Sequence, residues 1–233
     1  MDLQWPGCRN ARDVGGLPTS DGRRIRDGVL IRSDSLHYLS PEGVEAVRRA
    51  GVSRILDLRG NAELEFFPSP FADDPLWVHQ PLQAADDPEH GQPTILEACT
   101  WMLDRRPELF AAAIKAIADE PDGAVLVHCH GGKDRTGMIV ALALSVAGVP
   151  KEEIVADYFR TQARLASWLE EQLGAEPDTS KHAEMIEFRD TRAETIVAIL
   201  RHLDTTYGGP EAYLRHGGLT DDDLDRLRSR LVA

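Results

Sequence analysis

Short apolar runs and longer segments of helical periodicity alternate along this chain. Residues 123–127 are small, β-branched and apolar, which is typical of a strand buried on both faces. Apolar and polar residues alternate over residues 53–59, and residues 76–79 form another short apolar run. We therefore predict strands at these three positions.

Helices are predicted between these strands. Ser40 and Pro41 suit the N-cap and the first turn of a helix that Gly51 ends. Apolar side chains recur at helical spacing through residues 95–118. The apolar residues 138–147 predict a buried helix, because a glycine and then a proline follow them closely.

Two amphipathic segments follow this buried helix. One helix is predicted to begin at Lys151 and to carry apolar residues as far as Leu169, and a second is predicted over residues 182–204. Gly and Pro within residues 174–178 separate the two. Apolar stripes of this kind usually belong to a core.

The remaining segments complete the predicted α/β fold. Residues 10–35 are rich in Gly, Arg and Asp, and a hairpin from 22–25 to 29–32 is expected to cover a sheet edge. Residues 83–93 are polar and contain two prolines, which predicts a mobile loop. Strands that alternate with helices imply a mostly parallel central sheet flanked by helices, and we expect one domain over residues 1–233.

The segment 128–137, HCHGGKDRTG, lies where the central strand ends and a helix begins. A strand, a glycine-containing loop and a helix N-terminus form an anion site, because successive backbone N–H groups and the helix dipole point toward the loop. Gly131 and Gly132 let the backbone approach an anion without a Cβ in the way.

Two side chains add chemistry to this predicted anion site. The unsatisfied amides and Arg135 favour the thiolate form of Cys129, and a thiolate is a nucleophile. The guanidinium of Arg135 can donate to two oxygens of a tetrahedral oxyanion. The Thr136 hydroxyl is near enough in sequence to stabilise the sulfur anion as it leaves. A phosphate monoester is the ligand that fits this set of groups.

The pattern His-Cys, five residues, Arg, Thr-Gly resembles the signature loop of the cysteine-dependent protein tyrosine phosphatase superfamily. The longer form HCxxGKDRTG is similar to a bacterial and fungal branch of tyrosine or dual-specificity phosphatases that also hydrolyse phosphoinositides. The segments 10–16 and 57–59 fit the same branch. The resemblance implies a tyrosine phosphatase-like fold, no cofactor or metal, and a phosphocysteine intermediate. It also implies that a helical insertion at about 151–205 forms a lid.

The reaction needs a general acid, and several carboxylates are candidates for it. Asp134 comes first, because an aspartate in this loop distinguishes the branch from ordinary tyrosine phosphatases. Asp57 comes second, because it lies at the carboxyl end of a predicted strand, where ligands of such sheets bind. Asp86 or Asp87 comes third, by analogy with phosphatases whose acid lies on a movable loop. Ion pairing is the alternative for Asp134, and a structural pair with Arg59 is the alternative for Asp57.

The loop also carries the residues expected to select the substrate. Lys133 and His130 place two ionisable side chains beside one anion, which favours substrates with more than one phosphate. Alternatively, Lys133 only neutralises Asp134 or Asp57. We expect phosphotyrosine hydrolysis first, with phosphoserine, phosphothreonine and phosphoinositides as additional substrates and inorganic phosphate as product. The expected phosphate- and substrate-binding residues are His130, Gly131, Gly132, Lys133, Thr136 and Gly137.

Other functional classes fit the loop less well. A nucleoside-triphosphate P-loop needs Gly at position 127 and Ser or Thr after Lys133, and neither is present. A rhodanese-like sulfurtransferase and a catalytically weak phosphate-binding module stay open as alternatives. Adjacent residues such as His128, Cys129 and His130 do not converge easily on one metal ion.

Composition restricts the partners and the compartment. The net charge of −13 argues against nucleic acid and anionic membranes as partners. The three cysteines have no disulfide-like spacing, which favours a reducing compartment. The N-terminus lacks the features of a signal peptide, and the longest apolar run is too short to span a bilayer. We therefore expect a cytoplasmic protein; the sequence does not indicate its oligomeric state.

Overall fold

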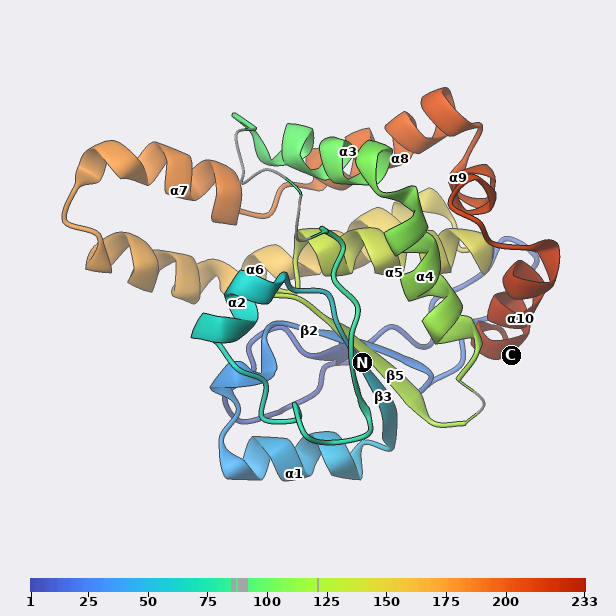
Figure 1. The fold of residues 1–233 in the computed structure, drawn as a ribbon, viewed down its shortest axis with the longest axis horizontal. Coiled ribbons are helices and arrows are strands. Elements are labelled where there is room, and N and C mark those ends of the chain that lie inside the picture. Colours follow the sequence, from blue (N-terminus) through green and yellow to red (C-terminus); the bar gives the residue numbers. More distant parts are fainter. Residues whose placement is uncertain (85–86, 88–91, 121) are drawn as a thin grey trace.

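The computed structural model describes residues 1–84, 87, 92–120 and 122–233. Within these residues it contains a five-stranded sheet in the order β1-β2-β5-β3-β4 (Figure 1). The predicted α/β fold with a mostly parallel sheet is confirmed, as are the three strands predicted from their apolar runs. Four strands run parallel and β1 is antiparallel to β2; their bounds are β1 (Arg12–Asp13), β2 (Leu30–Ser33), β3 (Val52–Asp57), β4 (Trp77–His79) and β5 (Ala124–His128).

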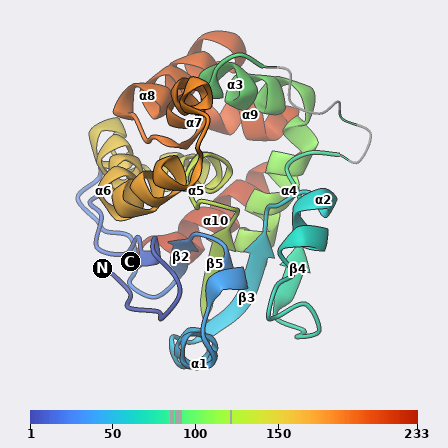
Figure 2. The same cartoon turned by 90° about the vertical axis from the view of Figure 1, so that its left-hand side faces the viewer.

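Alternate residues of β5 face opposite sides of the sheet, as the period of two of a strand requires. Val125 and Val127 lie in the larger core, and Ala124 and Leu126 lie in the smaller one. Helix α1 and the N-terminal segment cover the smaller core, and most of the other helices lie on the opposite side (Figure 2). The helices nearest the sheet are α1 (Pro41–Arg49), α4 (Pro107–Ala118), α5 (Asp134–Val146) and α10 (Asp221–Leu231).

Two of the segments predicted to be helical are each divided into two helices. Residues 95–118 form α3 (Ile95–Arg105) and α4, because Pro107 disfavours a helical conformation at Arg106, whose ψ is 50°. Residues 182–204 form α7 (His182–Arg189) and α8 (Ala193–His202), followed by a π-helical turn, Leu203–Tyr207. The prediction of one helix over residues 182–204 was wrong, and the helical spacing through residues 95–118 belongs to two helices.

Helices α6 (Lys151–Ala175) and α7 lie side by side and project from the body of the molecule (Figures 1 and 2). The short 3-10 helix η2 (Thr179–Lys181) connects them at the far end. The predicted break at residues 174–178 covers the end of α6 and the start of this connection. The two helices therefore form a helical hairpin, which we call the α6–α7 hairpin.

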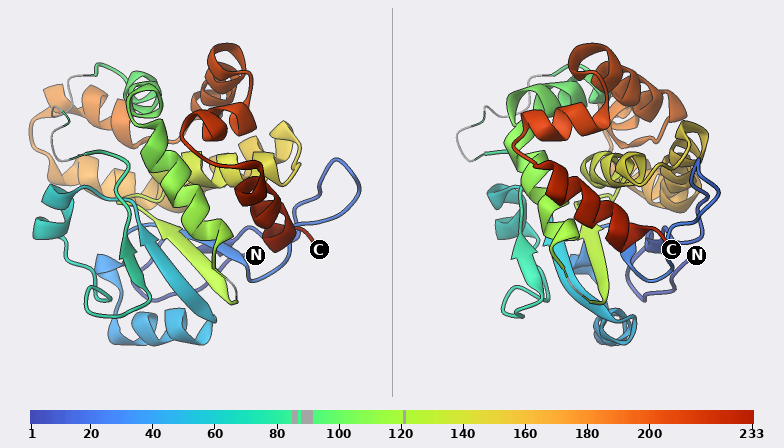
Figure 3. Two further views of the ribbon diagram at one scale, coloured as in Figure 1. Left: turned by 45° about the vertical axis from the view of Figure 1, so that its right-hand side comes forward. Right: turned by 90° about the vertical axis from the view of Figure 1, so that its right-hand side faces the viewer.

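The N-terminal hairpin prediction was wrong. Ile25 donates its backbone N–H to Leu17 and bridges to Val232, so residues 22–25 do not pair with residues 29–32. The fully buried strand β2 pairs with β1 and β5 instead. The C-terminal helix α10 lies beside α4 (Figure 3), and Val232, which follows it, forms the bridge with Ile25. The remaining elements are η1 (Leu36–Tyr38), α2 (Asn61–Phe66) and α9 (Pro210–His216).

The predicted loop at residues 83–93 lies partly outside the described residues. Asp86 is among the residues that are not described, so the structure does not place this candidate acid. In the part of the chain that is described, no helix has both the length and the apolar character needed to span a bilayer.

Candidate active site

The carboxyl ends of the parallel strands meet at one edge of the sheet. Strand register places His128 opposite both Ser33 and Asp57, and it places Asp57 opposite His79. Cys129 directly follows His128, so the predicted anion loop begins at the centre of this edge. The loop ends at Asp134, where α5 begins, four residues before the apolar run that predicted this helix.

The backbone of the loop leaves its amides free for a ligand. Among the described residues, the N–H groups of residues 130–133 donate to no acceptor. Gly132 has a φ of +62°, and a Cβ there would lie 2.2 Å from the Ser33 carbonyl oxygen. Gly132 therefore allows the loop backbone to lie close to the end of β2. Gly131 has no positive φ, and a Cβ there would only make ordinary contacts, with Leu165 at 3.7 Å and Lys133 at 3.8 Å.

Cys129 opens onto a cavity of about 390 Å³. Its own exposed fraction is 3%, so the thiol lies at the bottom of this cavity. The α6–α7 hairpin forms one wall, and Arg189 lies over the Trp168 ring, 5.6 Å from the ring centroid. Aromatic side chains form much of the lining: Tyr38, Phe67, Trp168 and Phe188.

The Arg135 guanidinium is oriented by a carboxylate that sequence reasoning missed. Both Glu63 carboxylate oxygens accept hydrogen bonds from Arg135, and the Oε1–Nη2 distance is 2.8 Å. Burial acts to raise the pKa of Glu63, but Arg135 outweighs it and lowers this pKa to about 2. The only sequence signal is an acidic residue in the first turn of a short helix, α2, close after the end of β3.

Asp57 lies beneath the loop and does not line the cavity. Its two oxygens accept hydrogen bonds from Arg59 at 2.8 and 2.6 Å, and both side chains are fully buried. Burial acts to raise the pKa of Asp57, but His128 and Arg59 together lower it to about 2. Arg59 also donates to the Ser35 hydroxyl and to the Phe67 carbonyl. This geometry matches the ion-pair alternative for Asp57.

Asp134 lines the cavity beside Cys129 and Arg135. The Tyr158 hydroxyl donates to its Oδ1 at 3.0 Å. The Tyr158 ring can reach this position because residue 137 is a glycine; a Cβ there would lie 2.6 Å from the ring. Gly137 therefore acts through Tyr158 on Asp134 and does not line the cavity itself.

Lys133 lines the cavity but is already paired. Its Nζ donates to the Asp190 carbonyl at 2.9 Å and lies 3.1 Å from Asp134 Oδ2. The alternative for Lys133 was an ion pair with Asp134 or Asp57. In the structure Lys133 is paired with Asp134. Burial is the main cause that lowers the pKa of the neighbouring His130, so this ring is mostly neutral at neutral pH.

Thr136 and His128 lie under the loop. The Thr136 hydroxyl is buried and has no hydrogen-bond partner within the described ranges of the chain. His128 Nδ1 lies 3.2 Å from the Cys129 carbonyl oxygen, and its Nε2 lies 3.4 Å from Asp57. Histidine and aspartate thus support the first residue of the loop from below.

Asp87 lies in an ion-pair cluster at the junction of α3 and α4. Its carboxylate accepts hydrogen bonds from Arg105 and Arg106 at 2.8 and 2.7 Å, and it does not line the cavity. The hydrogen bonds from Arg106 are the main cause that lowers its pKa to about 2. The structure therefore does not bring Asp87 together with Cys129.

Comparison with known proteins agrees with this geometry. A family model described as "Tyrosine phosphatase family" matches residues 3–233. The chain is 29% identical to the triple specificity protein phosphatase PtpB of Mycobacterium tuberculosis, and the match covers 98% of each chain. It is 28% identical to a putative tyrosine-protein phosphatase of Cupriavidus necator, covering all of this chain and 89% of that one. It is 30% identical to a tyrosine-protein phosphatase of Nostoc commune, covering 92% and 78%.

The chain therefore belongs to the tyrosine phosphatase family. It is an enzyme of the protein tyrosine phosphatase class, as its relatives are named. The resemblance stated from the loop motif is confirmed.

Proposed function

We propose that the protein hydrolyses phosphate monoesters through a phosphocysteine intermediate. The observation that supports this most directly is the position of Cys129 below the free amides of residues 130–133, with Arg135 beside them. These groups can donate to the oxygens of a phosphate while the sulfur attacks phosphorus in line.

The proposed reaction has two steps. The Cys129 Sγ bonds to phosphorus as the ester P–O bond breaks, and Asp134 gives a proton to the leaving oxygen. Water then attacks phosphorus while Asp134 accepts its proton, and the P–S bond breaks to release inorganic phosphate and the thiolate. Arg135 and the loop amides donate to the phosphate oxygens throughout. The Thr136 hydroxyl, which has no hydrogen-bond partner among the described residues, is the proposed donor to the departing sulfur.

Asp134 is the proposed general acid because it lines the cavity and Asp57 does not. Tyr158 and Lys133 hold its carboxylate in place. Asp57 is instead a positioning residue, since it pairs with Arg59 beneath the loop. Glu63 is a second positioning residue, because it fixes the plane of the Arg135 guanidinium.

Phosphotyrosine is the proposed first substrate because aromatic side chains line the cavity. An aryl ring packs well against Phe67 and Trp168, whose rings both lie near the His130 ring. Phosphoserine, phosphothreonine and phosphoinositides are proposed as additional substrates, in keeping with the relative that is named a triple specificity phosphatase. Because Lys133 is paired, Arg189, which also lines the cavity, is the proposed contact for a second phosphate.

The α6–α7 hairpin is the proposed lid, within a single phosphatase domain. Leu165, Trp168, Phe188 and Arg189 of this hairpin line the cavity, so its movement would open or close the route to Cys129.

The proposed function predicts a clear difference between Cys129→Ser and the wild type. Serine at this position lacks an ionised sulfur, so hydrolysis of a phosphotyrosine peptide should fall by about a thousandfold or more. Binding of tungstate, a phosphate analogue, should stay within a few-fold, because the loop amides and Arg135 remain. Steady-state kinetics and calorimetry measure the two quantities.

Each competing class predicts a different outcome of the same experiment. A rhodanese-like sulfurtransferase would convert thiosulfate and cyanide and leave the phosphotyrosine peptide intact. A phosphate-binding module would bind tungstate with no turnover in the wild type. Either outcome, or an active Cys129→Ser variant, would contradict the proposal.

A further inference from the structure

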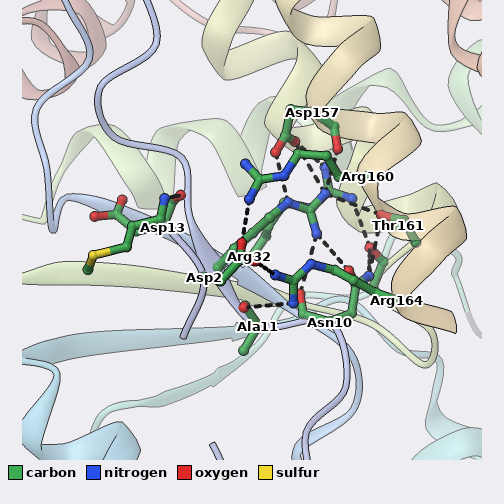
Figure 4. Close-up of polar contacts among 12 residues, drawn as sticks. Asp2, Asn10, Ala11, Asp13, Arg32, Asp157, Arg160, Thr161 and Arg164 are labelled. Carbon is green, nitrogen blue, oxygen red and sulfur yellow. Dashed lines mark hydrogen bonds and ion pairs between the residues drawn. The ribbon is translucent and has the colours of Figure 1, made fainter. Parts of the chain in front are cut away.

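A buried cluster of polar side chains lies under the N-terminal side of the loop. Asn10, Arg32 and Asp157 converge between β2 and α6, with Thr161 beside them (Figure 4). Arg12 Nε donates to Asp157 Oδ1 at 2.8 Å, and Arg32 Nη1 donates to Asp157 Oδ2 at 2.7 Å. The exposed fractions of Asn10, Arg12, Arg32 and Asp157 are all 3% or less. The mechanism above uses none of these residues.

Donors from this cluster reach the backbone of the loop. Asn10 Nδ2 donates to the carbonyl oxygens of Gly131 and Gly132, both at 3.1 Å. Arg32 Nη2 donates to the Gly132 carbonyl at 2.8 Å. The Ser35 backbone N–H donates to the His130 carbonyl, also at 2.8 Å. Three successive loop carbonyls therefore point away from the cavity and have partners.

The direction of these carbonyls determines the direction of the loop amides. A trans peptide unit is planar, and its C=O and N–H point in opposite directions. When the carbonyls of His130, Gly131 and Gly132 point outward, the N–H groups of Gly131, Gly132 and Lys133 point inward. These are amides that have no acceptor among the described residues. The hydrogen bonds to the three loop carbonyls therefore orient the loop N–H groups toward the cavity.

The charged groups of the cluster shift one another's pKa values. Two guanidinium groups share one carboxylate, and all three are buried. Burial and the charge of Arg32 lower the pKa of Arg12 to about 9. Burial acts to raise the pKa of Asp157, but the two arginines outweigh it and lower this pKa to about 2. A simple buried ion pair needs one arginine and one carboxylate. The second arginine of this cluster therefore calls for another explanation.

We propose that Asn10 and Arg32 are positioning residues of the phosphate site, and that Arg12 and Asp157 orient them. They hold the loop in the conformation in which its amides face the phosphate. Arg12 acts through the Asn10 Oδ1, which accepts from its Nη1 at 2.6 Å. The inference rests on the proposed function for its catalytic consequence, but the loop geometry and the thiolate can be measured without turnover.

The test compares Asn10→Ala and Arg32→Lys with the wild type. Asn10→Ala removes the donor to two carbonyls, and Arg32→Lys keeps the charge but cannot donate to Asp157 and Gly132 in the same way. We expect tungstate affinity to fall about tenfold in each, since each loses a fixed donor geometry at an oxyanion site. In Asn10→Ala, the pH midpoint for alkylation of Cys129 by iodoacetamide, followed by peptide mass spectrometry, should also rise. With p-nitrophenyl phosphate, kcat should fall more than KM changes.

Arg164→Gln is the matched control. Arg164 also connects the N-terminal segment to α6, through Asp2 and the Ala11 carbonyl, but it does not contact the loop (Figure 4). This variant should lower the melting temperature and leave tungstate affinity and the alkylation midpoint within twofold of the wild type.

Three outcomes would overturn the inference. One is unchanged tungstate affinity and alkylation midpoint in folded Asn10→Ala; another is equal effects in Arg164→Gln. The third is loss of folding in both Asn10→Ala and Arg32→Lys, which would assign the cluster a role in folding and not in positioning the loop. If the wild type itself hydrolyses no phosphate ester, the proposed function fails, while the binding and alkylation measurements still decide this inference.

Discussion

At the scale of single residues, the surroundings of an aspartate decide what it can do. Asp134 lines the cavity, with a hydroxyl and an ammonium beside its carboxylate. Asp57 is fully buried and both its oxygens are taken by Arg59. Asp87 is paired with arginines at a helix junction. The three candidate acids are alike in sequence, and the contacts separate them.

The loss of kcat in Asp134→Asn should be larger for an ester whose leaving group needs a proton than for one whose leaving group does not. For a phosphotyrosine peptide we expect kcat to fall about a hundredfold or more, which is the usual contribution of a general acid. For p-nitrophenyl phosphate the loss should be much smaller, because nitrophenolate leaves without a proton. Asp87→Asn is the control and should stay within twofold of the wild type on both substrates. Equal losses on the two esters would contradict the assignment of Asp134.

Asp57→Asn should act on stability first. The variant leaves the buried Arg59 without its charged partner, and we expect a loss of about 3–5 kcal/mol in the free energy of unfolding. Rates on the phosphotyrosine peptide and on p-nitrophenyl phosphate should fall by the same factor, since the loop is disturbed and no proton donor is removed. A selective loss on the peptide would instead make Asp57 the general acid.

The stability difference between Asp57→Asn and the wild type should depend on pH. The folded-state pKa of Asp57 is about 2, below its ordinary value of 3.8. A carboxylate with a lowered pKa stabilises the fold fully above its unfolded-state pKa, and this contribution is lost as the pH falls toward the folded-state value. Denaturant unfolding should therefore show a constant difference above about pH 5 that shrinks between pH 4 and pH 2.

At the scale of elements, the strands were predictable and some helix ends were not. Apolar runs such as residues 124–127 are short and fully buried, so their pattern predicts a strand without ambiguity. The break at Arg106 has a local signal, because Pro107 follows it. The break after Arg189 has no glycine or proline. At this break the Asp190 carbonyl accepts a hydrogen bond from Lys133, which lies 57 positions away in sequence. A contact of that range cannot be read from local periodicity.

The same limit applies to the candidate site. Cys129, Arg135 and the glycines could be recognised because they are adjacent in one motif. Glu63, Asn10 and Arg32 reach the loop from other strand ends and from the N-terminal segment, so only the fold brings them together. The hairpin predicted at residues 22–32 was wrong for a related reason: the best partner of β2 is the distant strand β5.

The bond between Lys133 and Asp190 predicts how the α6–α7 hairpin is held. Lys133→Met leaves the Asp190 carbonyl without its donor, and a hydrogen bond to a charged group contributes about 1.5–3 kcal/mol. Amide hydrogen exchange in α7 should therefore become about tenfold faster or more. Tungstate should slow exchange in the wild type if the hairpin closes over the bound anion.

Lys181→Met is the control for this experiment. Lys181 lies at the far end of the hairpin, is 56% exposed and pairs only loosely with Glu176, at 3.6 Å. Exchange in α7 of this variant should match the wild type. If Lys133→Met also matched the wild type, the α7 end would be held by its packing and not by the loop.

At the scale of the whole molecule, an enzyme for anionic substrates carries a net charge of −13. The positive charge near the cavity is local: Arg135 and Lys133 are paired with carboxylates, and Arg189 lies at the wall. A small phosphate ester meets mainly this local charge, whereas an extended anionic surface meets the charge of the whole face. The cytoplasmic location stays a prediction.

This contrast predicts a salt-dependent preference between two forms of one phosphoinositide. A water-soluble, short-chain form should be hydrolysed faster at low ionic strength than the same headgroup in anionic vesicles, because the acidic protein is repelled by the vesicle surface. Screening shortens the electrostatic range from about 30 Å at 0.01 M salt to about 8 Å at 0.15 M, so the difference should narrow as salt is added. Neutral phosphatidylcholine vesicles with the same phosphoinositide content are the control. A faster rate on the anionic vesicles would show that a positive face of the molecule, and not its net charge, governs the approach to membranes.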